Sequence, residues 1–519
     1  MKKYFLPFIV LSLVIAFAAS FILTSPSTAQ AAEPKQGGWM TVSTDSTAVG
    51  LDPHIAIAFA SSTYFEHCYE SLLRYTKDMT LEPSLATSWE QPDHLTYIFH
   101  LRKGVKFHDG GDFTAEDVKF TFERILDPKT NCPRKTYFES IDKIEILDPY
   151  KVKFSMSQPY PPFLNVAATW YGSIVSKATV EKHGSLQSEV IGTGPFKLKK
   201  YEHGVKGVFE RYADYWDKPK PYIDGFDFIV IKDDTSRIAA LRKGIVDVGW
   251  VKEAQMASLM EKEKNLKILS ASAVRQQRIW FKVDKPPFDN IKVRQAISAC
   301  IDRQEIIDTV MFGKAELSTS VPTDCKPYGL SQEEMAKLPF YKQDYELAKK
   351  LLAEAGYPNG FEFTLITSPH SPDYIPAAEV LQRQFLKAGI RMKIEQKDWG
   401  ITLKAYRSGQ FHSIMFAGVW YPDPEAYCVS MFHSKSNANY FGYNDPKLDK
   451  MFDAQKTEIN LEKRVKMWHE LQRYMAETVP AIWPYTSTPR YEIVNQKVQN
   501  YNLLGNNSRV LLRQAWLEK

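Results

Sequence analysis

The stretch from Leu81 to Pro128 decides the fold: LEPSLATSWEQPDHLTYIFHLRKGVKFHDGGDFTAEDVKFTFERILDP. Apolar residues alternate with polar ones in its first half, at Leu95, Tyr97, Phe99 and Leu101. That period of two predicts a strand with one buried side. Thr114 then offers an N-cap, with acidic residues in the first turn of a helix. The apolar stripe Val118, Phe122 and Ile125 predicts that this helix packs on the strand.

The literal residues of this stretch carry more information than its periodicity. Ser84–Trp89, Leu101–Gly110 and Phe113–Val118 together resemble the signature of family 5 of the extracellular solute-binding proteins. This is the dipeptide, oligopeptide and nickel group of ABC-importer receptors. Further matching segments are Leu51–His54, Tyr69–Leu73, Gly192–Phe196, Pro286–Asn290, Ile301–Arg303 and Val479–Tyr485. The resemblance therefore extends over essentially the whole chain beyond its first residues.

The resemblance implies a two-lobed α/β periplasmic-binding-protein fold, with hinge-linked lobes and an additional small α+β domain on the first lobe. A chain of 519 residues is in any case too long for one core. We expect the first lobe at 32–77, 185–275 and 486–519, the small side domain at 78–184, and the second lobe at 276–485. Lobe closure is expected to be a hinge motion near residues 185–190, 270–276 and 485.

The first 31 residues have the parts of a secretory signal peptide. Lys2 and Lys3 precede an apolar run from Phe5 to Leu23, and Ala29-Gln30-Ala31 supplies a cleavage site. We expect cleavage after Ala31 and a periplasmic protein, although the run is also long enough for an uncleaved membrane anchor. The formal charge of +5 gives no reason to expect a nucleic-acid partner. A monomer is expected.

Local patterns also predict the connections within the lobes. Phe226–Ile231, a helix capped by Asp233–Thr235, and Val246–Trp250 form a β-α-β unit, for which a parallel pair is the default. In the second lobe, strands are expected near residues 361–365, 390–394 and 413–419, with helices between them. The last of these strands is apolar without alternation, as a strand covered on both faces should be.

Open parallel sheets bind ligands outside the carboxyl ends of their strands. The side chains that end or follow the predicted strands are therefore the candidate ligand contacts. They are Asp45, Trp250, Ser368, His370, Trp399, Trp420, Tyr421 and Asp423. Closure of two lobes over such rings would bury apolar ligand surface, while polar neighbours fix its orientation.

Each candidate also has an ordinary structural explanation. A tryptophan at a strand end often only closes a core, and His370 lies in a Ser-Pro-His-Ser-Pro loop where solvent can satisfy it. His108 belongs to a turn of the side domain and is expected to be structural. The nearby acids Asp109, Asp112, Glu116 and Asp117 are explained by turn and capping roles.

One departure from the family bears on specificity. Many peptide-binding members carry an aspartate four residues before the proline matched here by Pro424, and that aspartate holds the ammonium group of the peptide. This chain has Trp420 there. Dipeptide-type members also place an arginine near the position of Ser368. Because a buried ammonium without a carboxylate is costly, we hypothesise that a free N-terminus is not held at this loop.

The function that the resemblance implies is capture of a peptide or peptide-like solute and its delivery to the transmembrane permease of an ABC importer. A non-peptide solute, such as a glycoside, another organic molecule or a nickel chelate, is the alternative. A secreted hydrolase is disfavoured, because no Gly-x-Ser-x-Gly, His-Glu-x-x-His or phosphate-loop motif is found. His370, His412 and His433 show no shared ligand spacing, so neither a metal site nor a cofactor is expected.

Five cysteines leave at least one without an intramolecular partner. Cys300 shares the apolar face of a predicted helix with Val293 and Ile297, which predicts an inert core thiol. Cys325 with Cys428 is the preferred disulfide, since the periplasm permits one.

Overall fold

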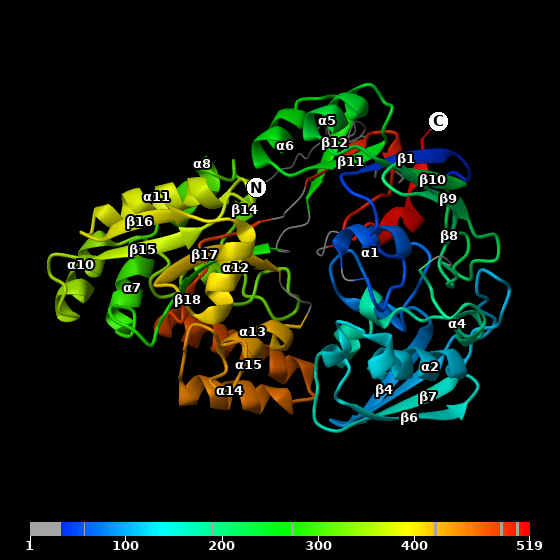
Figure 1. The fold of residues 1–519 in the computed structure, drawn as a ribbon, viewed down its shortest axis with the longest axis horizontal. Coiled ribbons are helices and arrows are strands. Elements are labelled where there is room, and N and C mark those ends of the chain that lie inside the picture. The colour runs from blue at the N-terminus through cyan, green and yellow to red at the C-terminus, as the bar shows by residue number, and fades with distance from the viewer. Residues whose placement is uncertain are drawn as a thin grey trace, which may run out of the picture.

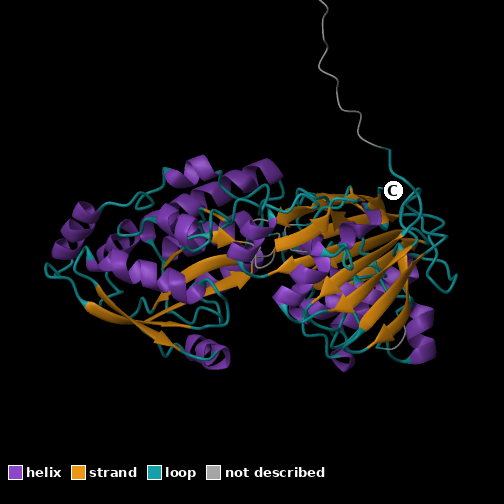
Figure 2. Ribbon diagram, turned by 90° about the horizontal axis from the view of Figure 1, so that it is seen from above, coloured by secondary structure: helices purple, strands orange, loops and turns teal. Residues whose placement is uncertain are grey.

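Two seven-stranded sheets form the centres of two lobes, which lie side by side in Figures 1 and 2. The computed structural model describes residues 33–56, 58–187, 190–270, 275–419, 423–487, 491–504 and 508–518. The predicted two-lobed α/β fold is confirmed. The predicted signal peptide lies outside the described residues, as do parts of the predicted hinge segments 185–190 and 270–276, whereas Tyr485 is described. No helix in the described ranges is long and apolar enough to cross a membrane.

The sheet of the first lobe combines segments from both ends of the chain. In spatial order its strands are β12 (Leu266–Ser270), β20 (Tyr491–Asn495), β11 (Val248–Val251), β1 (Trp39–Thr44), β10 (Gly225–Val230), β9 (Lys206–Arg211) and β8 (Phe196–Glu202). Its helices are α1 (Phe59–Phe65), α5 (Asp234–Arg242) and α6 (Ala254–Met260). The hairpin β21 (Val498–Gln499) with β22 (Trp516–Leu517) lies near the C-terminus.

The predicted β-α-β unit is β10-α5-β11, and it differs from the expectation in one respect. β10 and β11 both run parallel to β1, which lies between them, so they are parallel but not neighbours. Val42 of β1 pairs with Phe228 on one side and with Val248 on the other. The inserted strand comes from the start of the chain, and a pattern confined to residues 226–250 carries no sign of it.

The sheet of the second lobe holds β14 (Ala315–Glu316), β19 (Thr486–Ser487), β13 (Arg275–Phe281), β17 (Ser413–Val419), β15 (Glu362–Thr367) and β16 (Arg391–Gln396), with β18 (Ala481–Ile482) also paired to β13. Its helices are α7 (Ile291–Ala299), α8 (Arg303–Thr309), α9 (Gln332–Ala336), α10 (Tyr345–Glu354), α11 (Tyr374–Leu386), α12 (Trp399–Ser408), α13 (Glu425–Phe432), α14 (Pro446–Lys456) and α15 (Leu461–Thr478). Arg275 pairs with Ser487 in this sheet, close to both expected lobe boundaries.

The side domain is a four-stranded sheet with α2 (Ala115–Leu126) against it, drawn in blue and cyan in Figure 1. Its strands, in order, are β4 (Ala86–Asp93), β5 (Thr96–Leu101), β7 (Lys151–Met156) and β6 (Ile141–Asp148). Short helices follow at α3 (Phe163–Val166) and α4 (Lys177–His183), and 3-10 turns occur at Pro128–Thr130, Lys135–Tyr137 and Trp170–Gly172 here and at Val510–Gln514 near the C-terminus.

Both local predictions for this domain are confirmed. Tyr97, Phe99 and Leu101 are buried on one face of β5. The Thr114 side chain accepts from the Glu116 N–H, while the Asp117 carboxylate accepts from the Thr114 N–H at 3.0 Å, which completes a capping box.

His108 joins the side domain to the first lobe, as its predicted structural role requires. Its Nε2 lies 2.9 Å from the carbonyl oxygen of Gly194, and its Nδ1 accepts from the N–H of Gly192. Both glycines pack closely against the backbone of His67 and Cys68, which follow α1. A Cβ on Gly192 would come 2.1 Å from the carbonyl oxygen of Cys68. Only glycine permits this approach.

A hairpin of β2 (Leu73–Tyr75) and β3 (Leu81–Pro83) reaches from the first lobe toward the second. Tyr75 and Met79 of this hairpin are part of the hydrophobic core of the second lobe. Met79 at the tip has a φ of 59°, a left-handed conformation that is uncommon for a side chain of this kind. The two lobes are therefore joined by packed side chains as well as by their strand crossings.

The expected disulfide is wrong. Cys68, Cys132, Cys300, Cys325 and Cys428 are all free thiols. Cys325 and Cys428 share the second-lobe core, but the Cys428 Sγ is directed to the carbonyl oxygen of Ser320 at 3.4 Å. A shared core does not by itself provide the bridging geometry. Cys300 is fully buried in the same core, which confirms its predicted role.

Candidate ligand site between the lobes

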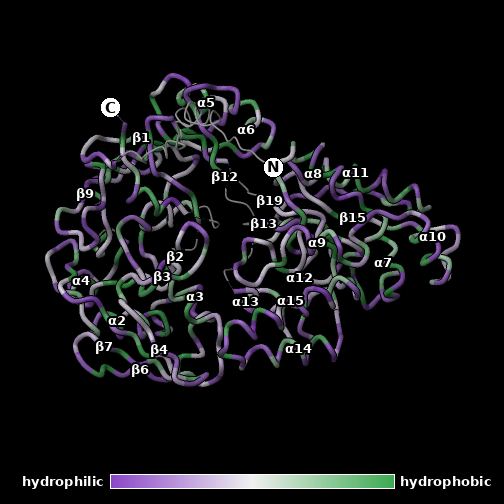
Figure 3. Tube along the Cα trace, turned by 180° about the vertical axis from the view of Figure 1, so that it is seen from behind, coloured by the Kyte–Doolittle hydropathy of each residue, from purple (hydrophilic) through white to green (hydrophobic). Residues whose placement is uncertain are grey.

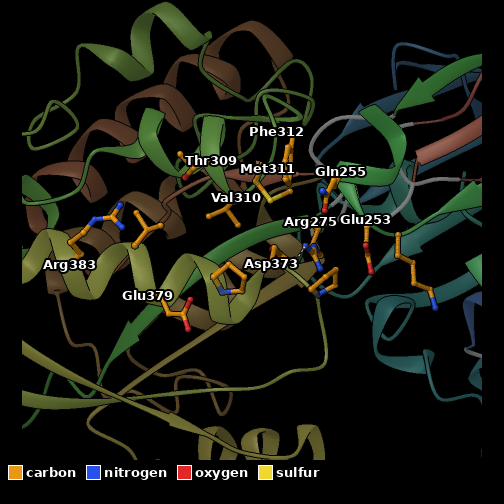
Figure 4. Close-up of a pocket in the computed structure, with 15 residues that line it drawn as sticks. Glu253, Gln255, Arg275, Thr309, Val310, Met311, Phe312, Asp373, Glu379 and Arg383 are labelled. Carbon is orange, nitrogen blue, oxygen red and sulfur yellow. Dashed lines mark hydrogen bonds and ion pairs between the residues drawn. The ribbon is translucent and has the colours of Figure 1, made fainter. Parts of the chain in front are cut away.

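A cavity of about 600 Å³ opens between the two lobes (Figure 4). The first lobe contributes Lys252 and Glu253, between β11 and α6, and Ala254 and Gln255 at the start of α6. The second lobe contributes Arg275 at the start of β13, the segment Thr309–Phe312 at the end of α8, and side chains along one side of α11, from Pro372 just before it to Arg383 in its last turn. Two of the loops that the sequence selected contribute to this wall. The residues that line it are neighbours of the predicted contacts: Lys252 follows Trp250, and Asp373 follows His370.

Arg275 and Asp373 form a buried ion pair in this wall. The guanidinium donates to the Asp373 carboxylate at 2.7 Å and to the Ser371 hydroxyl at 2.5 Å, while the Tyr485 hydroxyl donates to Asp373 at 2.7 Å. Burial opposes ionisation of Asp373, but the charge of Arg275 and these hydrogen bonds outweigh it and lower the pKa. The network fixes the loop that carries His370 to both strand segments, β13 and the Tyr485 segment.

Lys252 and Asp45 lie at the carboxyl ends of neighbouring first-lobe strands. The Lys252 Nζ is 3.0 Å from the Asp45 carboxylate, and the Ser46 hydroxyl donates to the same carboxylate at 2.9 Å. The lysine side chain remains 49% exposed. Since an ammonium has three donors, Lys252 can bind an anionic ligand while it keeps this ion pair.

His370 and Trp399 form a flat aromatic platform on the second lobe. Their ring centroids are 4.5 Å apart and the planes are inclined by only 9°. Partial burial lowers the pKa of His370, and the positive charges of Arg275 and Lys252 lower it further. The imidazole is therefore neutral at pH 7. The Ser368 hydroxyl, itself buried, accepts from the His370 N–H at 3.2 Å and holds this loop in shape.

The structure places two predicted contacts away from the cavity. Trp250 is 1% exposed, and the guanidinium carbon of Arg509 lies 4.1 Å from its ring centroid, because every residue of β11 is buried within the first-lobe sheet. Asp423 is also 1% exposed and receives both Arg464 donors, at 2.7 and 2.8 Å. Both are structural residues in this arrangement.

The remaining predictions divide as follows. None of the described predicted contacts lines the cavity itself. Asp45 is paired with Lys252 of its wall, His370 and Trp399 stack on each other near the cations Arg275 and Lys252, and Ser368 accepts from the backbone N–H of His370. Trp420 and Tyr421 lie outside the described residues. Within the described ranges, no group of three or more His, Cys, Asp or Glu side chains is arranged to hold a metal ion.

Sequence reasoning missed Lys252, Arg275 and Asp373. Lys252 immediately follows a predicted strand, so the rule that selected Trp250 could have selected it. Asp373 precedes α11 and resembles a helix cap, yet its side chain makes no capping hydrogen bond and pairs with Arg275 instead. Nothing local to either residue shows that pairing.

Comparison with known proteins agrees with this architecture. The model of the family described as bacterial extracellular solute-binding proteins, family 5 middle, matches residues 80–439. The glutathione-binding protein GsiB of Escherichia coli (strain K12) is 31% identical over 363 residues, which are 70% of this chain and 70% of GsiB.

Two solved structures extend the similarity to nearly the whole chain. The ABC transporter-associated periplasmic binding protein DppA from Helicobacter pylori, in complex with the peptide STSA, is 26% identical with a TM-score of 0.73, covering 93% of this chain and 99% of DppA. AgaA from A. tumefaciens R10, in complex with agropinic acid, is also 26% identical with a TM-score of 0.73, covering 93% of this chain and 99% of AgaA. The chain is therefore a member of family 5 of the bacterial extracellular solute-binding proteins, and it is a substrate-binding receptor of an ABC importer, not an enzyme.

Proposed function

We propose that this receptor captures a short peptide or peptide-like solute with a carboxylate group between its lobes and delivers it to the transmembrane permease. The observation that carries the proposal is the placement of Lys252 and Arg275 near the neutral His370–Trp399 platform, at a cavity of about 600 Å³. Pockets of roughly 300–1,000 Å³ suit drug-sized ligands, and a tripeptide is of that size.

Each part of the site matches one part of such a ligand. The ammonium of Lys252 attracts a carboxylate, and the ring faces of His370 and Trp399 provide a flat surface for a peptide plane or an apolar side chain. The two contributions come from different lobes, so a bound ligand would hold the lobes together.

In the described part of the loop that follows Trp420, the ammonium end of a peptide finds no comparable partner. Asp423 is the one acid between residues 420 and 424, and Arg464 already neutralises it in a bidentate pair. This supports the hypothesis that a free N-terminus is not held there.

The relatives support two classes of cargo. GsiB is named for glutathione, a tripeptide, and DppA was solved with a peptide, which favours the peptide class. AgaA was solved with agropinic acid, which keeps a non-peptide organic solute as the second candidate. A glycoside or a nickel chelate belongs to the same second class.

Calorimetric titration with reduced glutathione and with Ala-Ala-Ala tests the proposal. Amidation of the ligand carboxylate should weaken binding by about tenfold or more, the equivalent of one charge-assisted contact, whereas N-acetylation should change it little. Lys252→Met should reproduce the effect of amidation, and Lys264→Met, at an exposed first-lobe lysine, is the matched control. Equal loss on N-acetylation would contradict the proposed orientation.

The cellular location and the assembly state belong to the same proposal. A signal peptide removed after Ala31 would release a monomer into the periplasm. N-terminal sequencing of the exported protein should begin at Ala32, and light scattering should give the mass of one chain. An N-terminus that still contains the apolar run would favour the membrane anchor instead.

A further inference from the structure

A second cavity, of about 540 Å³, lies between the side domain and the second lobe. It shares no wall residue with the cavity beside Lys252. One wall comes from β3, β4, β5 and the segment at α3, and the other from residues 326–328 and from the turn between α14 and α15. Figure 1 shows the side domain next to α14 and α15, and Figure 3 shows α3 near α13. The Asn165 side chain of α3 donates to Asp423 at 3.4 Å.

The wall of this second cavity is mainly aromatic and aliphatic. The rings are those of Trp89, Tyr97, Tyr160 and Tyr328, and the aliphatic side chains are Met79, Leu81, Leu164, Ile459 and Leu461. Ile459 and Leu461 remain 50% and 55% exposed at its edge. An apolar cavity with a few polar groups at its edge is the usual form of a small-molecule binding site.

Two lysines give the cavity an electrostatic preference. Lys326 and Lys456 both belong to the second-lobe wall, and no ion pair involves either of them within the described ranges. The third cation, Arg464, is neutralised by Asp423. Glu458, the one carboxylate in the wall, accepts from the backbone N–H of Asn460 at 2.7 Å. Glu458 keeps its negative charge in this hydrogen bond. With Arg464 offset by Asp423, the two lysines against Glu458 leave the wall a net positive charge of one, which favours an acidic group on a ligand.

We propose that this cavity is a second binding site, for a small amphipathic anion with an aromatic or branched aliphatic body and one acidic group. The body packs between the tyrosine and tryptophan rings, and the acidic group lies at Lys326 and Lys456. Because the two walls belong to the side domain and the second lobe, the bound molecule joins these two parts. The site is independent of the cargo proposed for the inter-lobe cavity.

Two naphthalene probes of the same shape test the proposal on the full mature protein. 8-Anilinonaphthalene-1-sulfonate carries a sulfonate, and N-phenyl-1-naphthylamine lacks it. The sulfonate probe should bind with one equivalent per chain. Lys326→Gln with Lys456→Gln should weaken it by about tenfold and change the neutral probe by less than about twofold. Lys264→Gln is the matched control for loss of an exposed lysine.

Filling the cavity separates this site from the other one. Ile459→Trp enlarges a half-exposed edge residue, so folding is preserved, and it should abolish binding of both probes. Ile401→Trp, at a residue of α12 that is 56% exposed and outside the cavity, should leave binding intact. Circular dichroism melts confirm that each variant is folded.

The overturning results are equally specific. If Ile459→Trp leaves sulfonate binding unchanged, or if Ile401→Trp lowers it as much, the cavity is not the site. If Trp399→Ala abolishes binding while Ile459→Trp does not, the probe occupies the inter-lobe cavity and the proposal fails. Equal affinity of both probes for the wild-type protein would show that Lys326 and Lys456 do not bind the acidic group, and would contradict the proposal.

Discussion

The imidazole of His370 lies flat on the indole of Trp399, with ring centroids 4.5 Å apart and planes inclined by 9°. The Trp399 ring also meets Phe416 edge-on, with a centroid separation of 5.7 Å, so the platform is anchored in the second-lobe core. Its histidine is held neutral by partial burial and by nearby cations. A neutral platform beside a lysine suits a ligand that has both a flat group and a negative charge.

The protonation of His370 should report on this arrangement. The wild-type pKa, followed by NMR of the imidazole, should lie below the usual 6.5. Trp399→Ala uncovers the ring and Lys252→Met removes a neighbouring positive charge, so each should raise the pKa. Ile401→Ala on the exposed face of α12 should not change it. A pKa that is the same in all four proteins would show that neither neighbour acts on the ring.

Acid should destabilise the protein partly through His108. Burial lowers the pKa of His108 to about 4, from 6.5 in the unfolded chain. Between these two pH values His108 is protonated in the unfolded chain but neutral in the folded protein. Stability is therefore lost as the pH falls from 6.5 toward 4. On this linkage His108 contributes on the order of 2 kcal/mol to the loss between pH 7 and 5.

Urea unfolding of His108→Gln at pH 7 and pH 5 measures this contribution. The variant should lose less stability between the two pH values than the wild type. His183→Gln, at an exposed histidine of α4, is the control and should behave like the wild type. Glu425 acts in the opposite direction, because burial raises its pKa to about 7, so the His108 effect is read from the difference between proteins. Identical pH dependence would contradict it.

The Asp423–Arg464 pair should be essential for stability. Arg464→Met leaves the Asp423 carboxylate buried without its partner, which should cost roughly 3–5 kcal/mol in urea unfolding. Adding Asp423→Asn should recover part of that loss, because the uncompensated charge disappears. Lys466→Met, at an exposed pair with Glu462 on the same helix, should cost less than about 1 kcal/mol. Additive effects in the double variant would exclude a direct pair.

The five cysteines should all react as thiols. Iodoacetamide added to the unfolded, unreduced protein should modify every cysteine in a mass spectrum. In the folded protein Cys428 should react very slowly, because burial raises its pKa to about 12 and leaves little thiolate. Two unmodified cysteines in the unfolded protein would restore the Cys325–Cys428 bridge that the sequence suggested.

The successful predictions rest on patterns complete within one segment. The alternation in β5 and the cap at Thr114 need only a few neighbouring residues, and both are confirmed. The rule about carboxyl ends of strands selected two loops that also carry residues of the cavity wall, Lys252 and Asp373.

The contacts that the sequence did not reveal depend on residues far away in the chain. Arg509 covers Trp250, and Arg464 neutralises Asp423 although it lies on a helix that begins 38 positions after that residue. β1 similarly enters between β10 and β11 from the start of the chain. These partners are set by tertiary packing, which overrides the local pattern.

The most direct test of the account is the identity of the natural cargo. Native mass spectrometry of the protein purified gently from its own periplasm gives the mass of the complex, and denaturation then releases the ligand for sequencing by fragmentation. The account predicts short peptides or a peptide-like acid that carries at least one free carboxylate, and their absence from Lys252→Met. A single cargo without a carboxylate, retained equally by Lys252→Met, would contradict it.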